Sequence, residues 1–559
     1  MKKIQNNKIF IPCFVILINL INFIACNLLL KSRYETVDDF MIANILSKTD
    51  GTYNFYSIHI HPILSYIIML LYKTNININC YTIVIILLQF IAFTTIGIIF
   101  LNKNIKVGTV FYTIIVVTIY TKVLSIINYT STAAMLIISG TIATMYYIET
   151  CNKKYKTIGI LLITIGAMLR MQTIVIVLPF LFYYIIYFSM KTQKYKNLKI
   201  MIPLIISILL IYVSNLFIYN FNPLYNNYSK FNNVRTYLFD YNVMNYEQNK
   251  VIFDEAGWTE NDYKVFYTYS FSDENFYTYS NLCNIKNHIE TKKVNFNKIA
   301  YTFKLLYKIT AQKRYMMLFI ELIIAIITYL IISKDRFYIA GIFFIFISIN
   351  YILCYTKPMY RVIIPLYAIS IIMTMYTVLN YENINEFEKK IYNKIITIIS
   401  VIVIIMDLFF TYKMASVYSK ENFKNIKDAI NYASNDKENA YIYSNVLGNI
   451  SLAYSIYEKL PDNALDNIRD MGDWDIYNKE YYEFKERYKI KNIMNDLYTK
   501  ENLLFISGNA YGADNQLYIN HIELIQKYIK EHYGIETKYE VKKSFGSNIK
   551  IYKIYIEEK

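Results

Sequence analysis

The sequence predicts an α-helical polytopic membrane protein with about eleven transmembrane helices and a C-terminal α/β domain. Composition gives the first indication, because 55% of the 559 residues are hydrophobic and only 18% are charged. The second is that apolar residues gather in runs of roughly 20, the length that crosses a bilayer. We place the transmembrane domain at residues 1–415 and a water-facing domain at 416–559.

The first predicted span, Phe10–Leu30, follows three lysines but is too long for a signal peptide and lacks an Ala-x-Ala cleavage site. The run Ile158–Met190 has 33 residues, about 50 Å as a helix, so we divide it into two short spans at Arg170. The remaining predicted spans are Tyr81–Leu101, Val107–Leu124, Thr132–Ile148, Ile200–Phe221, Met316–Ile332, Phe337–Tyr355, Val362–Leu379 and Ile395–Thr411.

The orientation depends on His61–Tyr72, an apolar segment of only 12 residues, which suits an interfacial or re-entrant helix. If it does not cross, the short segments on the side of the N-terminus hold 17 Lys and Arg, against eight on the other side. The positive-inside rule then predicts a multi-pass protein of the cell membrane with a cytoplasmic N-terminus. The loops 31–80 and 222–313 and the C-terminal domain are expected to be extracytoplasmic.

The C-terminal 140-odd residues read as a small α/β domain. Short strands are predicted at Ala440–Val446 and Leu503–Ser507, and helical spacing at Gln516–His532. Two further strands are predicted within Tyr539–Tyr555, on either side of the turn Phe545-Gly546-Ser547-Asn548.

Composition also excludes some classes of function. The six cysteines show neither a disulfide framework nor zinc-ligand spacing. The net charge of +16 lies mostly in short loops between apolar runs, so it does not indicate nucleic-acid binding. The lipid bilayer is the partner that the sequence indicates most directly.

Two adjacent carboxylates, Asp38 and Asp39, follow the first span by fewer than ten residues. Such a pair can supply a general base and a group that orients it, and partial desolvation near a membrane raises the pKa of a carboxylate. The alternative is a solvated loop in which one of the two caps a helix over Phe40–Leu46.

Around this pair the sequence resembles the GT-C superfamily of membrane glycosyltransferases. That pattern has an acidic pair in the first outer loop, then a glycine and a His-Pro-Pro-Leu-like start to a short apolar helix. This chain has Asp38-Asp39, Gly51 and His61-Pro62-Ile63-Leu64 in that order, and it departs from the pattern at Ile63. The resemblance covers residues 1–415 as a layout and about 30 residues as a motif.

The resemblance implies transfer of a sugar from a polyprenyl-phosphate-linked donor to an extracytoplasmic acceptor, either a cell-surface glycan, a lipid or a protein. Asp38 or Asp39 would act as the general base, with Asp39 slightly favoured. The leaving phosphate needs cationic partners, for which we select Arg170, Arg361 and Arg235. The alternative for Arg170 and Arg361 is that they extend to the membrane interface without a further role.

Other candidate residues of the binding pocket are His59, His61, Gln172 and Trp258. The spacing of the two histidines fits zinc poorly, so we assign no metal ligands. Some members of the superfamily use a divalent cation and others do not, and the resemblance leaves this open.

Two other functions are kept as alternatives. A polymerase or ligase of lipid-linked oligosaccharides would show the same many spans and a large outer loop with arginines. A non-enzymatic flippase or transporter would usually show spans broken by glycine and proline, and this chain has only 14 Gly and 8 Pro.

Overall fold

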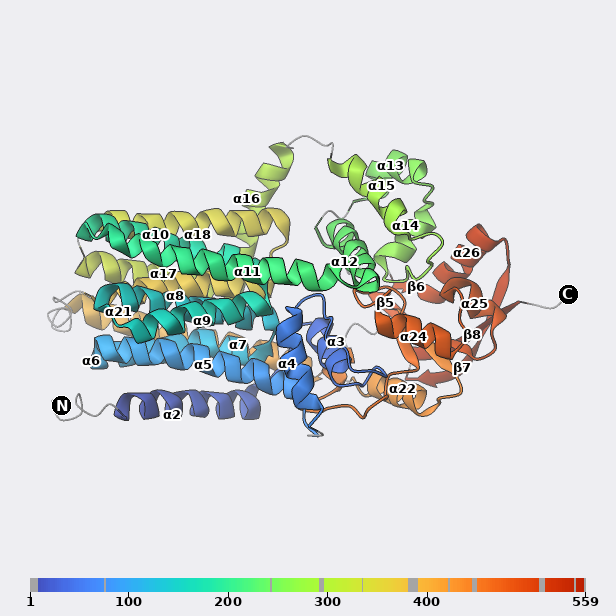
Figure 1. The fold of residues 1–559 in the computed structure, drawn as a ribbon, viewed down its shortest axis with the longest axis horizontal. Coiled ribbons are helices and arrows are strands. Elements are labelled where there is room, and N and C mark those ends of the chain that lie inside the picture. Colours follow the sequence, from blue (N-terminus) through green and yellow to red (C-terminus); the bar gives the residue numbers. More distant parts are fainter. Residues whose placement is uncertain are drawn as a thin grey trace.

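The computed structural model describes residues 9–74, 77–241, 244–290, 296–333, 335–380, 391–420, 423–444, 450–511, 518–546 and 549–556. They form a bundle of long helices and, at one end of it, a mixed body of helices and strands (Figure 1). The chain begins at the far end of the bundle and ends at the far side of the body. The predicted basic segments at the N-terminus and at 380–394 lie largely outside the described residues.

Ten described helical segments are long and apolar enough to cross a membrane, one fewer than predicted. The missing one is α9 (Lys153–Leu169), which has 17 residues because the chain leaves the helix at Arg170. The ten segments are α2 with its π-helical end (Phe10–Leu30), α5 (Cys80–Lys103), α6 to α7 (Ile105–Ser125), α8 (Tyr129–Thr150), η3 with α10 (Met171–Thr192), η4 with α11 (Tyr195–Asn220), α17 (Lys313–Ile332), α18 (Arg336–Thr356), α19 (Tyr360–Val378) and Ile398–Ala415 within α21 (Ile391–Lys420).

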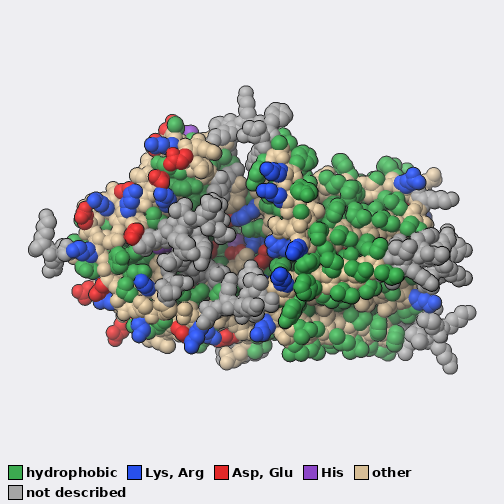
Figure 2. All heavy atoms as spheres, turned by 180° about the vertical axis from the view of Figure 1, so that it is seen from behind, with side chains coloured by type: hydrophobic (Ala, Val, Ile, Leu, Met, Phe, Trp, Pro, Cys, Tyr) green, Lys and Arg blue, Asp and Glu red, His purple; other side chains and the backbone are tan. Residues whose placement is uncertain are grey.

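The bundle exposes an apolar surface between two polar ends. Helices α8 and α19 are buried along most of their length, whereas α2, α11 and the apolar part of α21 bury only a small share of their residues. Figure 2 shows hydrophobic side chains covering the bundle, with lysines and arginines at its two ends. An exposed apolar surface of this extent is typical of helices that face lipid.

Glycines allow a close contact between helices α8 and α9. A Cβ added to Gly159 would lie 2.4 Å from the Oγ1 atom of Thr144, and one on Gly166 would lie 2.7 Å from the carbonyl oxygen of Ala133. Gly140 of α8 faces the Gly159 carbonyl at a similar distance. Because α9 ends at Arg170, this contact fixes where the Arg170 side chain emerges from the bundle.

The longer segments that connect the helices of the bundle lie at the end of the bundle that carries the body. The first includes α3 (Val37–Leu46) and α4 (Pro62–Tyr72), and the 11 residues of α4 lie crosswise to the long helices rather than among them (Figure 1). Helix α12 (Pro223–Thr236) continues from α11 into the body. The strands β1 (Arg33–Tyr34) and β2 (Ile126–Ile127) pair in parallel and join the first connection to the start of α8.

The sheet of the body confirms the predicted strands of the tail. Its order is β4-β3-β5-β8-β7, with β6 also paired to β5. Strand β3 is parallel to β4 and β5, whereas β8 is antiparallel to β5 and β7. The bounds are β3 (Ala440–Tyr443), β4 (Ile468–Asp470), β5 (Leu503–Tyr511), β6 (Tyr518–Asn520), β7 (Thr537–Phe545) and β8 (Ile549–Ile556).

The long connection after α11 and the tail share one hydrophobic core. The connection contributes Trp258, Phe266 and Tyr277 to the same buried cluster as Phe505 of β5. The Tyr277 ring stacks on that of Tyr528 in α26 (His521–Tyr533), with 6.0 Å between centroids. The two segments therefore fold as one body. Its helices are α12, α13 (Lys250–Glu255), α14 (Glu260–Tyr267), α15 (Tyr279–Glu290), α22 (Lys424–Asn435), α23 (Ile450–Ala453), α24 (Lys479–Arg487), α25 (Ile493–Thr499) and α26 (His521–Tyr533), and α16 (Phe296–Thr310) leads back to the bundle.

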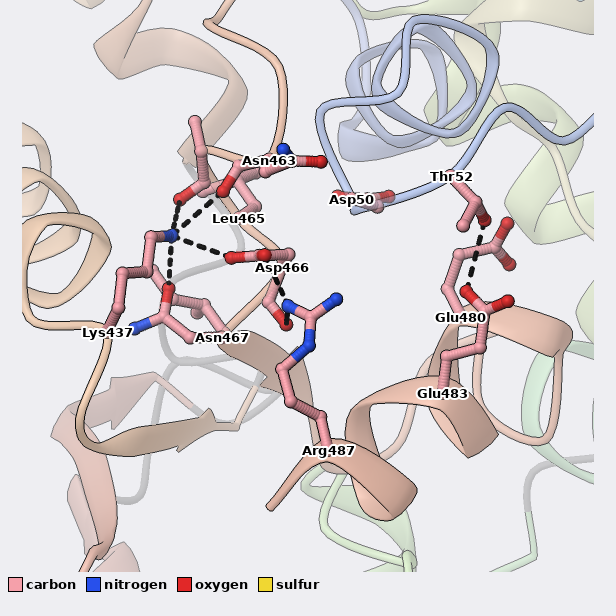
Figure 3. Close-up of polar contacts among 12 residues, drawn as sticks. Asp50, Thr52, Lys437, Asn463, Leu465, Asp466, Asn467, Glu480, Glu483 and Arg487 are labelled. Atoms are coloured by element: carbon pink, nitrogen blue, oxygen red, sulfur yellow. Dashed lines mark hydrogen bonds and ion pairs between the residues drawn. The ribbon is translucent and has the colours of Figure 1, made fainter.

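The first connection of the bundle is bonded to the tail along its backbone. The carbonyls of Lys48 and Thr49 each accept a 3.0 Å hydrogen bond, from the amides of Asn463 and Leu465. Beside them, Thr52 donates to Glu483 and the Lys437 amine binds four oxygens of residues 463–467 (Figure 3). The bonds of Lys48, Thr49 and Thr52 hold the body against the end of the bundle that carries α3, and those of Lys437 brace the segment of the tail that they contact.

We predict that Gly159→Val destabilises the protein, because the added side chain cannot fit between α8 and α9. Overpacking of this kind costs roughly 1–3 kcal/mol, so the melting temperature in detergent should fall by several degrees. Leu161→Ala is the matched control, since Leu161 lies on the same helix and is 54% exposed. Equal melting temperatures for Gly159→Val and wild type would contradict this packing.

Candidate functional site

The acidic pair lies in the first turn of α3, where the two carboxylates take different environments. The helix begins at Val37 with Thr36 as its N-cap, and both Asp38 and Asp39 lie inside its first turn. The alternative that one of them caps a helix beginning at Phe40 is therefore wrong. Successive side chains of a helix point about 100° apart, so the pair cannot face one site together.

Asp39 is an anchor that ties α3 to two other helices. It is fully buried, and its Oδ1 accepts hydrogen bonds from the Tyr81 hydroxyl at 2.7 Å and the Tyr129 amide at 3.1 Å. Its Oδ2 accepts from the Asn128 amide group at 2.9 Å. Burial raises the pKa of Asp39 to about 8, in the direction that the sequence predicts for a desolvated carboxylate. Both of its oxygens are occupied, and neither faces open space.

Asp38 is half-buried and lies among groups that favour its charged form. Burial alone would raise the pKa of Asp38, yet its pKa lies below the usual value because His59, Arg361 and Arg170 lie nearby. Burial lowers the pKa of His59 to about 3, so this ring is neutral at pH 7. The two arginines therefore keep Asp38 ionised under ordinary conditions.

Arg170 is held at the point where α9 ends and the segment Met171–Thr192 begins. It is extended, with φ −158° and ψ 101°, between α9 and the 3-10 turn Met171–Thr173. Its Nη1 lies 3.1 Å from Nδ1 of His59, and its guanidinium lies 5.6 Å from the centre of the Tyr129 ring. The sequence correctly places a helix break at Arg170.

Arg361 reaches the same place from the second residue of α19. Among the described residues, neither Arg170 nor Arg361 forms a direct ion pair with a carboxylate. Their charges act on Asp38 from a distance, so both guanidinium groups can bind an incoming anion.

Glu35 is a third carboxylate of this site, which the sequence reasoning missed. The amide of Glu35 donates a 3.0 Å bond to the Ile127 carbonyl, next to the paired strands β1 and β2. Burial raises the pKa of Glu35 to about 7, although Arg361 opposes the rise. Glu35 lies only three residues before Asp38 in the sequence, and this proximity could have revealed it as a candidate. We call Glu35, Asp38, His59, Arg170 and Arg361 the charged cluster.

The tail covers the charged cluster. The Trp474 ring meets His59 edge-on with 4.7 Å between centroids, and the Asn232 amide group donates to the Trp474 carbonyl. Arg235 is buried on α12, where its Nε donates to Asn232 at 2.9 Å. Burial raises the pKa of the neighbouring Asp473 to about 7, and Arg235 opposes this rise. Arg235 is therefore a buried residue of the part of the body that covers the charged cluster.

The members of the charged cluster keep part of their surface accessible, although they lie between the bundle and the body. Figure 2 shows a hollow between these two parts, with basic and acidic side chains inside it. We infer that water and polar solutes reach the cluster through this hollow.

Three other predicted pocket residues do not join the charged cluster. His61 caps α4, where its Nδ1 accepts from the Ile63 amide and its Nε2 lies 3.1 Å from Oγ of Ser214. Gln172 is exposed in the 3-10 turn beside Arg170. Trp258 is 2% exposed in the core of the body, and its indole donates to Asn281.

Within the described part of the chain, no group of three His, Cys, Asp or Glu side chains is arranged to hold a metal ion. Comparisons with known proteins add no family assignment: no model of a protein family matches the chain, and no curated protein matches it at a significant level. The resemblance to GT-C glycosyltransferases therefore rests on the motif residues and on the layout of the helices.

We predict that Glu480→Gln stabilises the protein at alkaline pH. Glu480 is 1% exposed beside Asp50 (Figure 3), and burial raises its pKa from 4.5 to about 7. The protonated form is favoured in the native state, so stability is fully present below pH 4.5 and is lost as the pH rises through 7. The variant should match the wild type at pH 5 and melt at a higher temperature at pH 8.

The exposed Glu486 of the same helix provides the control, because Glu486→Gln should leave the melting temperature unchanged at both pH values. If Glu480→Gln gave the same difference from the wild type at pH 5 and pH 8, Glu480 would not titrate as described.

Proposed function

We propose that the protein is a multi-pass membrane glycosyltransferase that transfers a sugar from a polyprenyl-phosphate-linked donor to an acceptor, with Asp38 as the general base. The observation that carries this proposal is an ionised, half-buried Asp38 beside Arg170 and Arg361, at the end of an apolar bundle. A base for a hydroxyl and cations for a phosphate are the two requirements of this transfer.

Charge distribution supports an extracytoplasmic site in the cell membrane. The short segments that the sequence predicts on the side of the N-terminus hold 17 Lys and Arg, against eight in those predicted on the other side. The charged cluster is formed by residues of the side with eight. Basic residues favour the cytoplasmic side. The proposed acceptor is therefore a cell-surface glycan, lipid or protein.

The proposed reaction uses the cluster as follows. An acceptor hydroxyl attacks the anomeric carbon of the donor sugar, and its proton passes to the Asp38 carboxylate. The bond between the anomeric carbon and the phosphate oxygen breaks, and the lipid phosphate leaves with that electron pair. Arg170 and Arg361 stabilise the negative charge that develops on the phosphate. The polyprenyl chain stays in the bilayer beside the bundle.

The environments of the two aspartates favour Asp38 over Asp39 as the base. Asp39 is enclosed by donors from Tyr81, Asn128 and Tyr129, so an acceptor hydroxyl cannot reach it without breaking those bonds. Asp38 keeps accessible surface, so an acceptor hydroxyl can approach it. The sequence alone favoured Asp39, and the proposal now assigns it the role of an anchor.

We predict that Asp38→Asn mainly lowers the rate of sugar transfer and that Asp39→Asn mainly lowers the stability of the protein. Asp38→Asn removes the proton acceptor and should slow sugar transfer about a hundredfold or more, while the protein still inserts and folds. Above pH 8 Asp39 is ionised, and Asp39→Asn then sets an amide donor against the three donors that bind the carboxylate, so it should lower the melting temperature. Transfer assays in proteoliposomes and thermal unfolding test the pair. A normal transfer rate in Asp38→Asn would remove the base from this proposal.

We predict that Arg170→Ala lowers the rate of transfer roughly a hundredfold or more while the protein still inserts and folds. The loss should appear as a lower kcat/KM for the lipid-linked donor, because the departing phosphate loses a cation. Arg336→Ala is the control, since Arg336 is exposed at the opposite end of the bundle. Equal kcat/KM values for Arg170→Ala and the wild type would contradict the role in phosphate binding.

A further inference from the structure

A second cavity lies on the body, outside the charged cluster. It has a volume of about 450 Å³, within the range of about 300–1,000 Å³ that small-molecule sites occupy. Helices α12, α15 and α24 and the segments before α15 and α24 contribute to its wall. None of its lining residues was a candidate from the sequence, because the segments that form it are far apart in the chain. We call it the tyrosine groove.

Aromatic rings form much of the tyrosine groove. Phe231 and Tyr477 are buried with their rings edge-on, 4.7 Å apart. Tyr279 and Tyr482 are 48% and 39% exposed, so their rings remain available to a ligand. An exposed aromatic face that is already held by its helix binds a flat apolar surface at little cost in conformational entropy.

Polar side chains stand beside these rings. The exposed Asn227 offers a planar amide, and Thr278 offers a hydroxyl. The Glu274 carboxylate is held by an ion pair with Lys485, and Lys230 is exposed. One carboxylate with one exposed lysine gives the groove no strong net charge, which disfavours nucleic acid. The polar groups likewise disfavour a lipid chain.

This combination of side chains suits a carbohydrate. A pyranose ring has one face of C–H bonds that packs on an aromatic ring, and hydroxyl groups around its edge that bond to amides and carboxylates. A peptide would more often require an exposed strand edge or a deep apolar groove.

The tyrosine groove lies close to both the bundle and the charged cluster. Helix α12 starts at Pro223, three residues after α11 ends, so its groove residues begin near the polar end of the bundle. Tyr477 follows Trp474 by three residues, and Trp474 contacts His59 of the cluster. Three residues span no more than about 11 Å, so one short segment borders both places.

We propose that the tyrosine groove is a carbohydrate-binding subsite that holds an oligosaccharide acceptor while its terminal hydroxyl extends toward Asp38. This inference rests on the proposed function and narrows the acceptor to a saccharide. The rings of Tyr279 and Tyr482 stack on its sugar units, and Asn227 and Glu274 bond to its hydroxyl groups.

The test measures the binding of free saccharides to the full-length protein in nanodiscs, and saturation-transfer NMR detects the bound saccharide. The probes are chitotetraose, cellotetraose and mannotetraose, with a Gly-Thr-Ser-containing hexapeptide as the rival acceptor. At least one saccharide should bind, and Tyr279→Ala with Tyr482→Ala should weaken its binding by at least about tenfold. Tyr241→Ala is the matched control, because Tyr241 is also 48% exposed but lies outside the groove.

Absence of binding by all three saccharides, undiminished binding in the double variant, or binding of the peptide alone would each overturn the inference. Asp38→Asn separates this result from the proposed function. Saccharide binding that persists in Asp38→Asn while transfer is lost supports both proposals. Lost transfer in Asp38→Asn without saccharide binding in any form of the protein overturns the groove alone.

Discussion

The arrangement of this protein depends on the cost of placing charged groups at the edge of an apolar bundle. A cation in hydrocarbon costs about 2.5–3.5 kcal/mol on insertion scales. Arg170 follows the last residue of α9 and Arg361 is the second residue of α19. Both lie near Asp38, and Arg361 also lies near Glu35. The body covers this charged cluster, and its members keep part of their surface accessible. The charged cluster therefore lies where the apolar bundle meets the body. We propose that the charged lipid carrier binds there.

Several separate contacts keep that place intact. The glycine contact between α8 and α9 positions Arg170, and the hydrogen bonds of Asp39 hold the first turn of α3, from which Asp38 projects. The backbone bonds of Lys48 and Thr49 to the tail bring the cover against the bundle. None of these contacts is made by the charged cluster itself. Each of them positions either a member of the cluster or the body that covers it.

The sequence predicted what depends on local pattern. Apolar runs predicted ten of the long helices and the division at Arg170. Short apolar runs and a turn signal predicted the strands β3, β5, β7 and β8 of the tail. It could not decide between Asp38 and Asp39, because their difference comes from Tyr81 and Asn128, which are remote in the chain. It also treated the connection 222–313 and the tail as separate, since a shared core of distant aromatic residues leaves no periodic signal. Trp258 belongs to that core, which is why its predicted pocket role has no support in the geometry.

The central claim is that a phosphate-linked sugar binds at the charged cluster, and its most direct test is a cryo-electron microscopy structure in nanodiscs with a polyprenyl-phosphate-linked hexose. The account predicts that the phosphate lies about 2.7–2.9 Å from the guanidinium nitrogens of Arg170 or Arg361, with the sugar on the side of Asp38. A donor phosphate bound at the opposite end of the bundle, or at the body away from both arginines, would contradict the account.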